Sequence, residues 1–433
     1  MKLKKYQRFI LISFIAFLFY ISNLYFDYDN SVKTGTYRRM LTSYDVTSNT
    51  FLPYEIITKG KIYFSDSTVK AMRRVEGNNK PHSLIKIDDR YYSSYPILSG
   101  LMAVPLYYLP LVMNKIPTLL YQENLLNILL LGRLSASLYT ALSVGLFYLI
   151  IDQINKHRDV KESKFTYLYL LFYALGTNIY SISSRSLWQH TSSLLINSLL
   201  ILLLIKAKDN PKIVKWLGLL CGLSFISRPT NILFILVITT FIFIKYKREV
   251  LLYFLTAGIS VLCLALYYYF VYGSPITNEY IARGDTDFNT PLWDGLLGNM
   301  FSPSRSFLFI TPPLALSFYG IYRLLIQKNK NYTDLLLSFL SISFIGTMLW
   351  LSTWWCWYGA DRFGYGLYTE WIPIAGLIVY IMSLDFKKYQ RIIFIILMIY
   401  SFYTQFNAVW FMKSRCSKEH NWTFECIKPA WNK

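Results

Sequence analysis

The sequence predicts an all-α polytopic membrane protein with about eleven membrane-spanning helices and one long first external loop. Of the 433 residues, 54% are hydrophobic and only 16% are charged. The hydrophobic residues stand in runs about as long as a bilayer is thick. Many of the 37 Tyr, 30 Phe and 11 Trp residues lie near the ends of these runs, where amphipathic rings favour the headgroup zone. This composition excludes a soluble globular protein.

The clearest apolar runs give the eleven expected spans. They cover residues 8 to 26, 129 to 151, 165 to 182, 191 to 205, 214 to 227, 229 to 244, 250 to 271, 306 to 322, 334 to 353, 368 to 384 and 392 to 411. The first run follows a basic head, as in a signal peptide, but it lacks a small-residue cleavage site and many spans come after it. We therefore expect it to be retained as the first span.

Basic residues indicate the orientation of these spans. If the N-terminus, with Lys2, Lys4 and Lys5, is cytoplasmic, five alternate connections between spans carry clusters of Lys and Arg, as the positive-inside rule requires. The clusters are Lys156/Arg158/Lys161/Lys164, Lys206/Lys208/Lys212/Lys215, Lys245/Lys247/Arg248, Arg323/Lys328/Lys330 and Lys387/Lys388/Arg391. The net charge of +20 then has a topological cause, so we expect no nucleic-acid partner. The expected location is the plasma (inner) membrane, with the N-terminus cytoplasmic and the C-terminus external.

The apolar segment 95 to 113 is expected not to span the membrane. Counting it as a twelfth span would place every downstream basic connection outside, and its prolines Pro105 and Pro110 suit a helix at the outer interface. The chain is thus expected to be a single transmembrane domain, 1 to 433, with a first external loop, 27 to 127, that contains interfacial helices. Residues 412 to 433 form an external tail. A twelfth span with an inverted remainder is the alternative.

Asp45 is the candidate catalytic residue. It lies in the polar stretch Ser43-Tyr-Asp-Val-Thr-Ser-Asn-Thr-Phe-Leu-Pro53 of the first external loop. A carboxylate that is held near the membrane surface and partly desolvated can act as a general base, because burial raises its pKa toward neutral pH. The alternative is a local role, since Asp in a stretch rich in Ser, Thr and Asn commonly bonds its own backbone in an Asx-turn or helix N-cap.

Three residues at outward turns are candidates for binding an anionic substrate. Arg185 and His190 bracket the turn Arg185-Ser-Leu-Trp-Gln-His190, where an arginine suits a phosphate and an imidazole suits a carboxylate or pyrophosphate oxygen. Arg228 lies in the tight turn Ser227-Arg-Pro-Thr, and its planar guanidinium matches a phosphate in bidentate geometry. The alternative is snorkelling or plain surface placement.

Aromatic and charged residues also gather in two later external segments and in one early segment. Arg305, in Gly298-Asn-Met-Phe-Ser-Pro-Ser-Arg-Ser306, and Arg362 are candidate anion clamps. Asp361 and Arg362 belong to Trp354-Trp-Cys-Trp-Tyr-Gly-Ala-Asp-Arg-Phe-Gly-Tyr-Gly366, and Glu370 follows. Aromatic rings beside such pairs can stack sugar faces, although the same composition also makes a membrane-interface belt. Tyr95 would place a hydroxyl at the outer interface, beside a helix that can shape a lipid-tail groove.

The cysteines give no sign of a metal site. The five cysteines form no CxxC pair and no Cys/His spacing suited to zinc, and no cofactor is evident. Dependence on a divalent metal stays open, because one carboxylate without a paired partner is a poor site. Cys416 and Cys426 can form a disulfide in the external tail if the compartment is oxidising; the alternative is two free thiols.

The order of these motifs resembles that of the GT-C class of membrane glycosyltransferases, in particular bacterial members similar to protein mannosyltransferases and aminoarabinose transferases. The resemblance covers nearly the whole chain. It implies a GT-C-like fold and transfer of a sugar from a polyprenyl-phosphate donor to a cell-envelope acceptor, which is a glycan, a lipid or a protein. The motifs are Asp45, Tyr95-Pro96, Leu175-Gly-Thr with Trp188-Gln-His-Thr191, Ser227-Arg-Pro-Thr230, Phe301-Ser-Pro-Ser-Arg305 and Tyr358-Gly-Ala-Asp-Arg-Phe-Gly364.

The resemblance implies that Asp45 is the catalytic base and that arginines such as Arg228 neutralise the departing phosphate. Members of the class often have adjacent acidic residues in this loop, whereas Asp45 stands between Tyr44 and Val46. Three other acids are therefore alternative bases: Asp27, Asp29 and Glu55.

The alternative function is a transporter or flippase of a lipid-linked or small anionic solute. Its signature would be an ionisable residue inside a span, and Arg133 is the notable candidate. No inverted repeat accompanies it.

Overall fold

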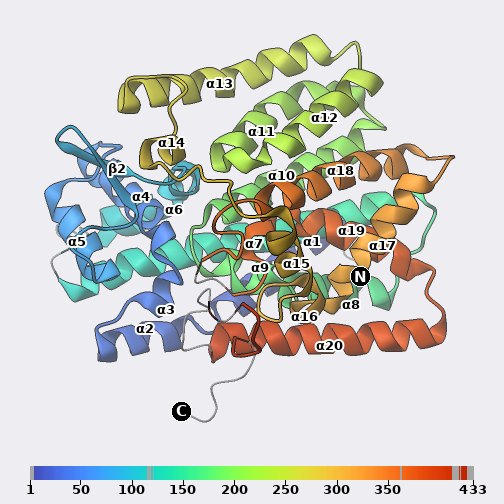
Figure 1. Ribbon diagram of the computed structural model, residues 1–433, viewed down its shortest axis with the longest axis horizontal. Helices are drawn as coiled ribbons and strands as arrows, with labels where there is room; N and C mark the ends of the chain where they lie inside the picture. Colours follow the sequence, from blue (N-terminus) through green and yellow to red (C-terminus); the bar gives the residue numbers. More distant parts are fainter. Residues whose placement is uncertain are drawn as a thin grey trace.

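The computed structural model describes residues 4–114, 119, 121–360, 363–411, 419 and 421–426. Within these ranges the chain is predominantly α-helical (Figure 1). The one sheet there is the antiparallel hairpin of β1 (Leu84–Ile87) and β2 (Arg90–Ser93).

Seven helical segments in the described part of the chain are long and apolar enough to cross a membrane. They are Lys5–Thr34, which contains α1 (Lys5–Ile21) and α2 (Leu24–Thr34), α7 (Gln122–His157), α10 (Gln189–Ala207), α13 (Val250–Tyr272), α18 (Tyr332–Ser352), Gly366–Leu384, which contains α19 (Ile372–Leu384), and α20 (Lys388–Trp410). The prediction of a helical protein with several membrane-length helices is confirmed.

The count of eleven spans stays a prediction. The other four apolar runs form the helices α8, α11, α12 and α17, which have 12 to 15 residues each, fewer than the roughly 20 that a span needs. Their bounds are Lys164–Leu175, Val214–Ser227, Ile232–Lys245 and Pro312–Ile326. The segment expected not to span contains α6 (Leu98–Asn114), a shorter apolar helix that packs against α4 (Thr47–Lys59), and its depth in a membrane is likewise untested.

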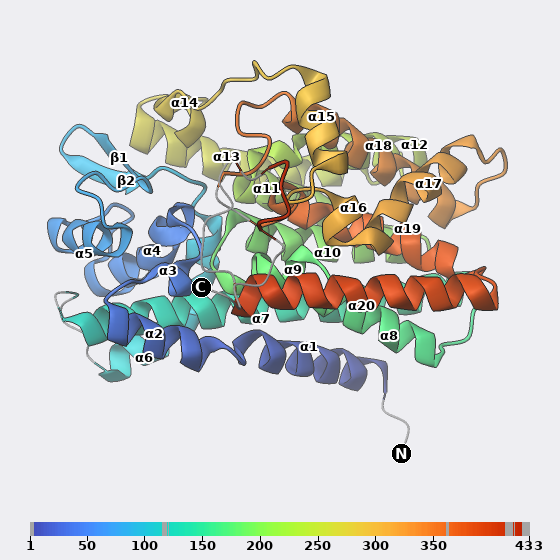
Figure 2. The same ribbon diagram turned by 60° about the horizontal axis from the view of Figure 1, so that its bottom comes forward.

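The basic connections lie at one end of the bundle of long helices. Figures 1 and 2 show the turns between α7 and α8, α17 and α18, and α19 and α20 at the right-hand end. The β1–β2 hairpin and α5 (Asp66–Glu76) lie at the left-hand end. The two groups of residues that the charge pattern assigns to opposite sides of a membrane are therefore at opposite ends of the molecule.

Close packing attaches the peripheral helix α13 to α11. Gly218 and Gly222, one turn apart on α11, face Tyr253 and Ser260 of α13. A Cβ atom added at Gly218 would lie 2.0 Å from the Tyr253 carbonyl oxygen. Small residues allow helix backbones to approach in this way without a hydrophobic driving force. This contact fixes the position of α13. The chain leads from α13 through a short loop to α14 (Glu279–Arg283), which lies beside the candidate site.

A buried carboxylate ties α2 to the centre of the molecule. Asp27 is fully buried, and its carboxylate lies 2.8 Å from Arg185, 3.6 Å from Arg133 of α7 and 3.7 Å from Arg39 of α3 (Arg38–Leu41). The Asn23 amide donates a hydrogen bond of 3.0 Å to the same carboxylate. Because a buried charge is costly unless it is paired, this Asp27 cluster fixes the start of the segment that leads from α2 to Asp45 against the bundle.

We expect Asp27→Asn to lower the free energy of unfolding by about 3 to 5 kcal/mol, because an amide cannot compensate the buried guanidinium groups of Arg133 and Arg185. Thermal unfolding of the purified protein in detergent measures the loss. Asp29→Asn is the matched control, since Asp29 pairs with Lys33 on the exposed surface of the same helix at 2.7 Å, and it should change stability little. Equal losses in the two variants would contradict the role given to Asp27.

Candidate functional site

Asp45 lines a cavity of about 300 Å³, here called the Asp45 cavity. Its polar residues include Asp45, His82, Tyr95, Gln189, His190 and Arg228. Its apolar residues include Ile281, Phe288, Trp350, Leu351 and Trp354. A concave site with apolar walls and a few converging polar groups is the usual form of a small-molecule site, and this one suits an amphipathic ligand.

The backbone around Asp45 forms a short helix just before α4. Asp45 lies in the short 3-10 helix η1 (Tyr44–Val46), where its backbone N–H donates to the Ser43 hydroxyl at 3.4 Å. The following helix, α4, begins after Val46 without a side-chain cap. Asp45 therefore does not cap α4, so the alternative of a helix N-cap does not hold.

The Tyr95 hydroxyl connects Asp45 with His82. Its oxygen lies 2.9 Å from Asp45 Oδ1 and 2.9 Å from His82 Nε2, while His82 Nε2 and Asp45 Oδ1 are 3.8 Å apart. Burial, with the charge of Asp45, raises the pKa of Tyr95 well above its usual range. The phenol therefore keeps its proton at neutral pH and can donate it to the Asp45 carboxylate.

Side chains of α4 hold Tyr95 in place. The Tyr95 backbone N–H donates to the Ser93 hydroxyl at 3.1 Å, and Ser93 donates to Ser48 at 2.8 Å. The Asn49 amide donates to the Pro96 carbonyl at 3.0 Å. Because α4 directly follows Asp45, the same helix positions both members of the Asp45–Tyr95 pair.

A buried ion cluster borders the cavity from the helical bundle. Glu370, in the short helix Gly366–Trp371, is fully buried, lies 2.6 Å from His190 Nδ1 and forms an ion pair with Arg228. Arg228 also donates to the Leu367 carbonyl at 2.8 Å. The carboxylate that His190 contacts here is that of Glu370, so its expected contact with a substrate stays a prediction. Arg228 and His190 both line the cavity, with Glu370 bound to each of them.

Two other predicted site residues are engaged elsewhere. Arg185 belongs to the Asp27 cluster. The Arg305 Nε donates to the Asn421 side chain at 2.9 Å, and the guanidinium lies 5.7 Å from the centre of the Tyr358 ring. Neither residue lines the Asp45 cavity, so we no longer assign either of them to a donor phosphate. Asp361 and Arg362 lie outside the described residues.

Among the four acids considered as a base, only Asp45 lines the cavity. Asp27 is held in its arginine cluster, and Asp29 pairs with Lys33 at the surface. Glu55 is fully buried and pairs with Lys59 at 3.3 Å. The structure therefore favours Asp45 over these three alternatives.

Sequence reasoning did not select His82, which lines the Asp45 cavity, or Arg283, which lies beside it against Tyr95. The Arg283 guanidinium lies 4.4 Å from the centre of the Tyr95 ring and 3.0 Å from the Asp285 carboxylate. It is an arginine in an expected external loop, which is the signal that selected Arg228. His82 could have been noticed as the only histidine of the expected first external loop.

A wider cavity of about 610 Å³, here called the outer cleft, adjoins the Asp45 cavity. The two share His82, Asp285 and Trp355 as lining residues. The outer cleft is also lined by Arg283 and Asp287, and the His82 side chain is 62% exposed. His82 therefore stands between the enclosed site and open solvent.

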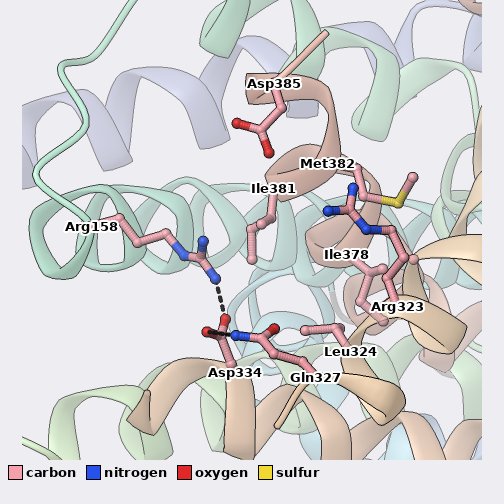
Figure 3. A pocket seen from close by; sticks show the side chains of 10 residues that line it. Arg158, Arg323, Leu324, Gln327, Asp334, Ile378, Ile381, Met382 and Asp385 are labelled. Atoms are coloured by element: carbon pink, nitrogen blue, oxygen red, sulfur yellow. Dashed lines mark hydrogen bonds and ion pairs between the residues drawn. The ribbon is translucent and has the colours of Figure 1, made fainter. Parts of the chain in front are cut away.

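A third cavity, of about 260 Å³, lies near the opposite end of α18 (Figure 3). Arg158 forms an ion pair with Asp334, to which Gln327 donates at 3.3 Å, and Arg323 and Asp385 stand beside them. Asp334 belongs to the first turn of α18, whereas Trp350, near its last turn, lines the Asp45 cavity. A helix of 21 residues is about 30 Å long, so the two cavities are separate. The third cavity has none of the predicted site residues in its lining.

Among the described cysteines, Cys356 lines the Asp45 cavity. No cluster of three or more His, Cys, Asp or Glu side chains suited to a metal ion occurs within the described ranges. Cys426 is disulfide-bonded, while its predicted partner Cys416 lies outside those ranges. Cys221 and Cys356 are buried, whereas Cys263 is exposed.

Comparisons of the chain with protein-family models, with curated proteins and with solved structures find no match. The fold and the site together define a helical protein with several membrane-length helices. Its amphipathic cavity has a carboxylate, a phenol and an imidazole in contact at its polar end.

We expect Glu370→Gln to lower the free energy of unfolding by about 3 to 5 kcal/mol, because it leaves the buried guanidinium of Arg228 uncompensated. Glu123→Gln, at an exposed position in the first turn of α7, is the control and should behave as the parent protein. In a double-mutant cycle, Glu370→Gln with Arg228→Gln should lose less than the sum of the single losses. Additive losses in thermal unfolding would show that the two residues are not coupled.

Proposed function

We propose that the protein is a glycosyltransferase of the plasma membrane that takes a sugar from a polyprenyl-phosphate donor and transfers it on the external face. The single observation that carries this proposal is the Asp45 cavity, where a carboxylate faces a space with an aromatic, apolar wall. A ligand with a sugar-phosphate head and a long hydrocarbon tail matches both parts. The acceptor is a glycan, a lipid or a protein of the cell envelope.

In the proposed reaction Asp45 is the general base. It accepts the proton of an acceptor hydroxyl while that oxygen attacks the anomeric carbon of the donor sugar. The bond between the anomeric carbon and the phosphate oxygen breaks, and the polyprenyl phosphate leaves with the electron pair. Attack opposite the leaving group inverts the configuration at the anomeric carbon.

The guanidinium of Arg228 supports departure of the phosphate as a positioned hydrogen-bond donor. Arg228 lines the cavity and is held by Glu370 and by the Leu367 carbonyl, so its guanidinium is positioned before the donor binds. Fixed donors of this kind stabilise charge that develops on a leaving group. The rings of Phe288 and Trp350, stacked with centroids 5.6 Å apart, offer a flat face to the sugar or to the first part of the lipid tail.

The transporter or flippase alternative depended on an ionisable residue inside a span. Arg133 is the ionisable residue within a span, and it is 1% exposed beside Asp27. Its pairing gives it a structural role in the Asp27 cluster. The enzyme is therefore the proposal that the described residues support better.

We expect Asp45→Asn to slow sugar transfer by a factor of about 10² or more, because the amide cannot accept a proton. The measurement is transfer of labelled sugar from a panel of polyprenyl-phosphate sugars to membrane acceptors by purified protein, with donor binding measured in parallel. Binding should persist in the variant. Asp66→Asn is the matched control, since Asp66 is an exposed acid of the first external segment that does not line the cavity.

Two results would contradict the proposal. Unchanged transfer by Asp45→Asn would place the base elsewhere. If no donor is turned over and lipid instead moves between leaflets of proteoliposomes, the protein is a flippase.

A further inference from the structure

We propose that His82 is a proton relay that returns Asp45 to its basic form after each transfer, acting through the Tyr95 hydroxyl and releasing the proton into the outer cleft. The inference rests on the proposed function, in which Asp45 receives one proton per sugar transferred. It adds a residue that acts after the transfer step.

The relay follows from the position of the Tyr95 hydroxyl, 2.9 Å from both Asp45 Oδ1 and His82 Nε2. A hydroxyl has one proton to donate but can accept at the same time. In one arrangement Tyr95 donates to the Asp45 carboxylate and accepts from the Nε2–H of His82. In the other it accepts from protonated Asp45 and donates to unprotonated Nε2. When the second arrangement, with protonated Asp45, changes into the first, one proton moves in net from Asp45 to His82.

The step balances without any other reactant. The acid proton of Asp45 moves to the Tyr95 oxygen while the Tyr95 proton moves to His82 Nε2. The products are the Asp45 carboxylate, an unchanged phenol and an imidazolium. The imidazolium then releases a proton to water in the outer cleft, and proton exchange with that water leaves Nε2 unprotonated, so Asp45 and His82 are both ready for the next transfer.

Exposure explains why a relay is useful. The Asp45 side chain is 16% exposed, whereas that of His82 is 62% exposed. A donor and an acceptor that fill the Asp45 cavity would cover the remaining surface of Asp45. His82 keeps contact with solvent because it also lines the outer cleft.

Neighbouring charged residues hold His82 and Tyr95 in position. The Glu76 carboxylate accepts the His82 backbone N–H at 2.7 Å, and Arg283 lies against the Tyr95 ring at 4.4 Å. Because the raised pKa of Tyr95 keeps the phenol protonated, Tyr95 can pass a proton only by accepting and donating together. The charged groups around the imidazole are Asp45 from η1, Glu76 from α5, and Arg283, Asp285 and Asp287 from α14 and the loop after it.

The test is transfer by His82→Ala in weakly buffered solution. Steady-state transfer should fall about tenfold, less than the factor of about 10² expected for loss of the base itself. The first turnover should match that of the parent protein, because Asp45 begins it unprotonated, and this also shows that the variant is folded. Free imidazole can enter the outer cleft of about 610 Å³ and should restore the steady-state rate in proportion to its concentration.

Two controls separate a relay from a purely structural role. Tyr95→Phe keeps the ring but removes the hydroxyl, so its steady-state rate should also fall, and imidazole should not restore it because His82 is still present. His157→Ala, at the opposite end of α7 from the site, should transfer sugar at the parent rate with or without imidazole.

The outcomes also separate the relay from the proposed function. Full steady-state activity of His82→Ala, or a loss that imidazole does not restore, would overturn the relay while the effect of Asp45→Asn stands. Full activity of Asp45→Asn would overturn both. Loss of the first turnover in both His82→Ala and His82→Gln would assign His82 to the transfer step and would also overturn the relay.

Discussion

The Asp27 cluster is the interaction on which the arrangement of the site depends. It joins α2 to Arg133 of α7 and to Arg185. The residue after Arg185, Ser186, lies 2.9 Å from the Thr42 hydroxyl, three positions before Asp45. The neighbouring residues Arg185 and Ser186 therefore attach the segment before Asp45 at two points, through buried charges at Asp27 and through a hydroxyl pair at Thr42. This double attachment fixes where Asp45 enters the cavity.

The site is assembled from two parts of the chain that meet at the cavity. The segment between α2 and α6 supplies Asp45, His82 and Tyr95, which are linked by the Tyr95 hydroxyl. The helical bundle supplies His190 and Arg228, which Glu370 links. Arg185, which binds Asp27, is only five residues before His190, which lines the cavity from α10. The same short stretch of chain therefore both anchors the first part and contributes to the cavity wall. A ligand that spans the cavity can therefore contact Asp45 from the first part and Arg228 from the second.

Local sequence patterns predicted the helical class, and four of the residues that they singled out line one cavity. Apolar runs are detectable because a membrane-spanning helix needs a long unbroken stretch of apolar residues. Asp45, Tyr95, His190 and Arg228 could be selected from the order of the motifs and from their expected outward placement. The structural partners of Arg185 and Arg305 could not be predicted in this way. Arg185 takes a partner 158 positions away and Arg305 a partner 116 positions away, and no local pattern encodes such pairings. His82 was missed for the same reason, since its meaning depends on Tyr95.

The most direct test of the account is an experimental structure of the protein with a non-transferable polyprenyl-phosphate sugar analogue. The proposal predicts that the anomeric carbon faces Asp45 and that the phosphate lies beside Arg228, with the sugar against the aromatic wall. A donor bound away from Asp45, such as in the cavity of Arg158 and Asp334 at the other end of α18, would contradict it.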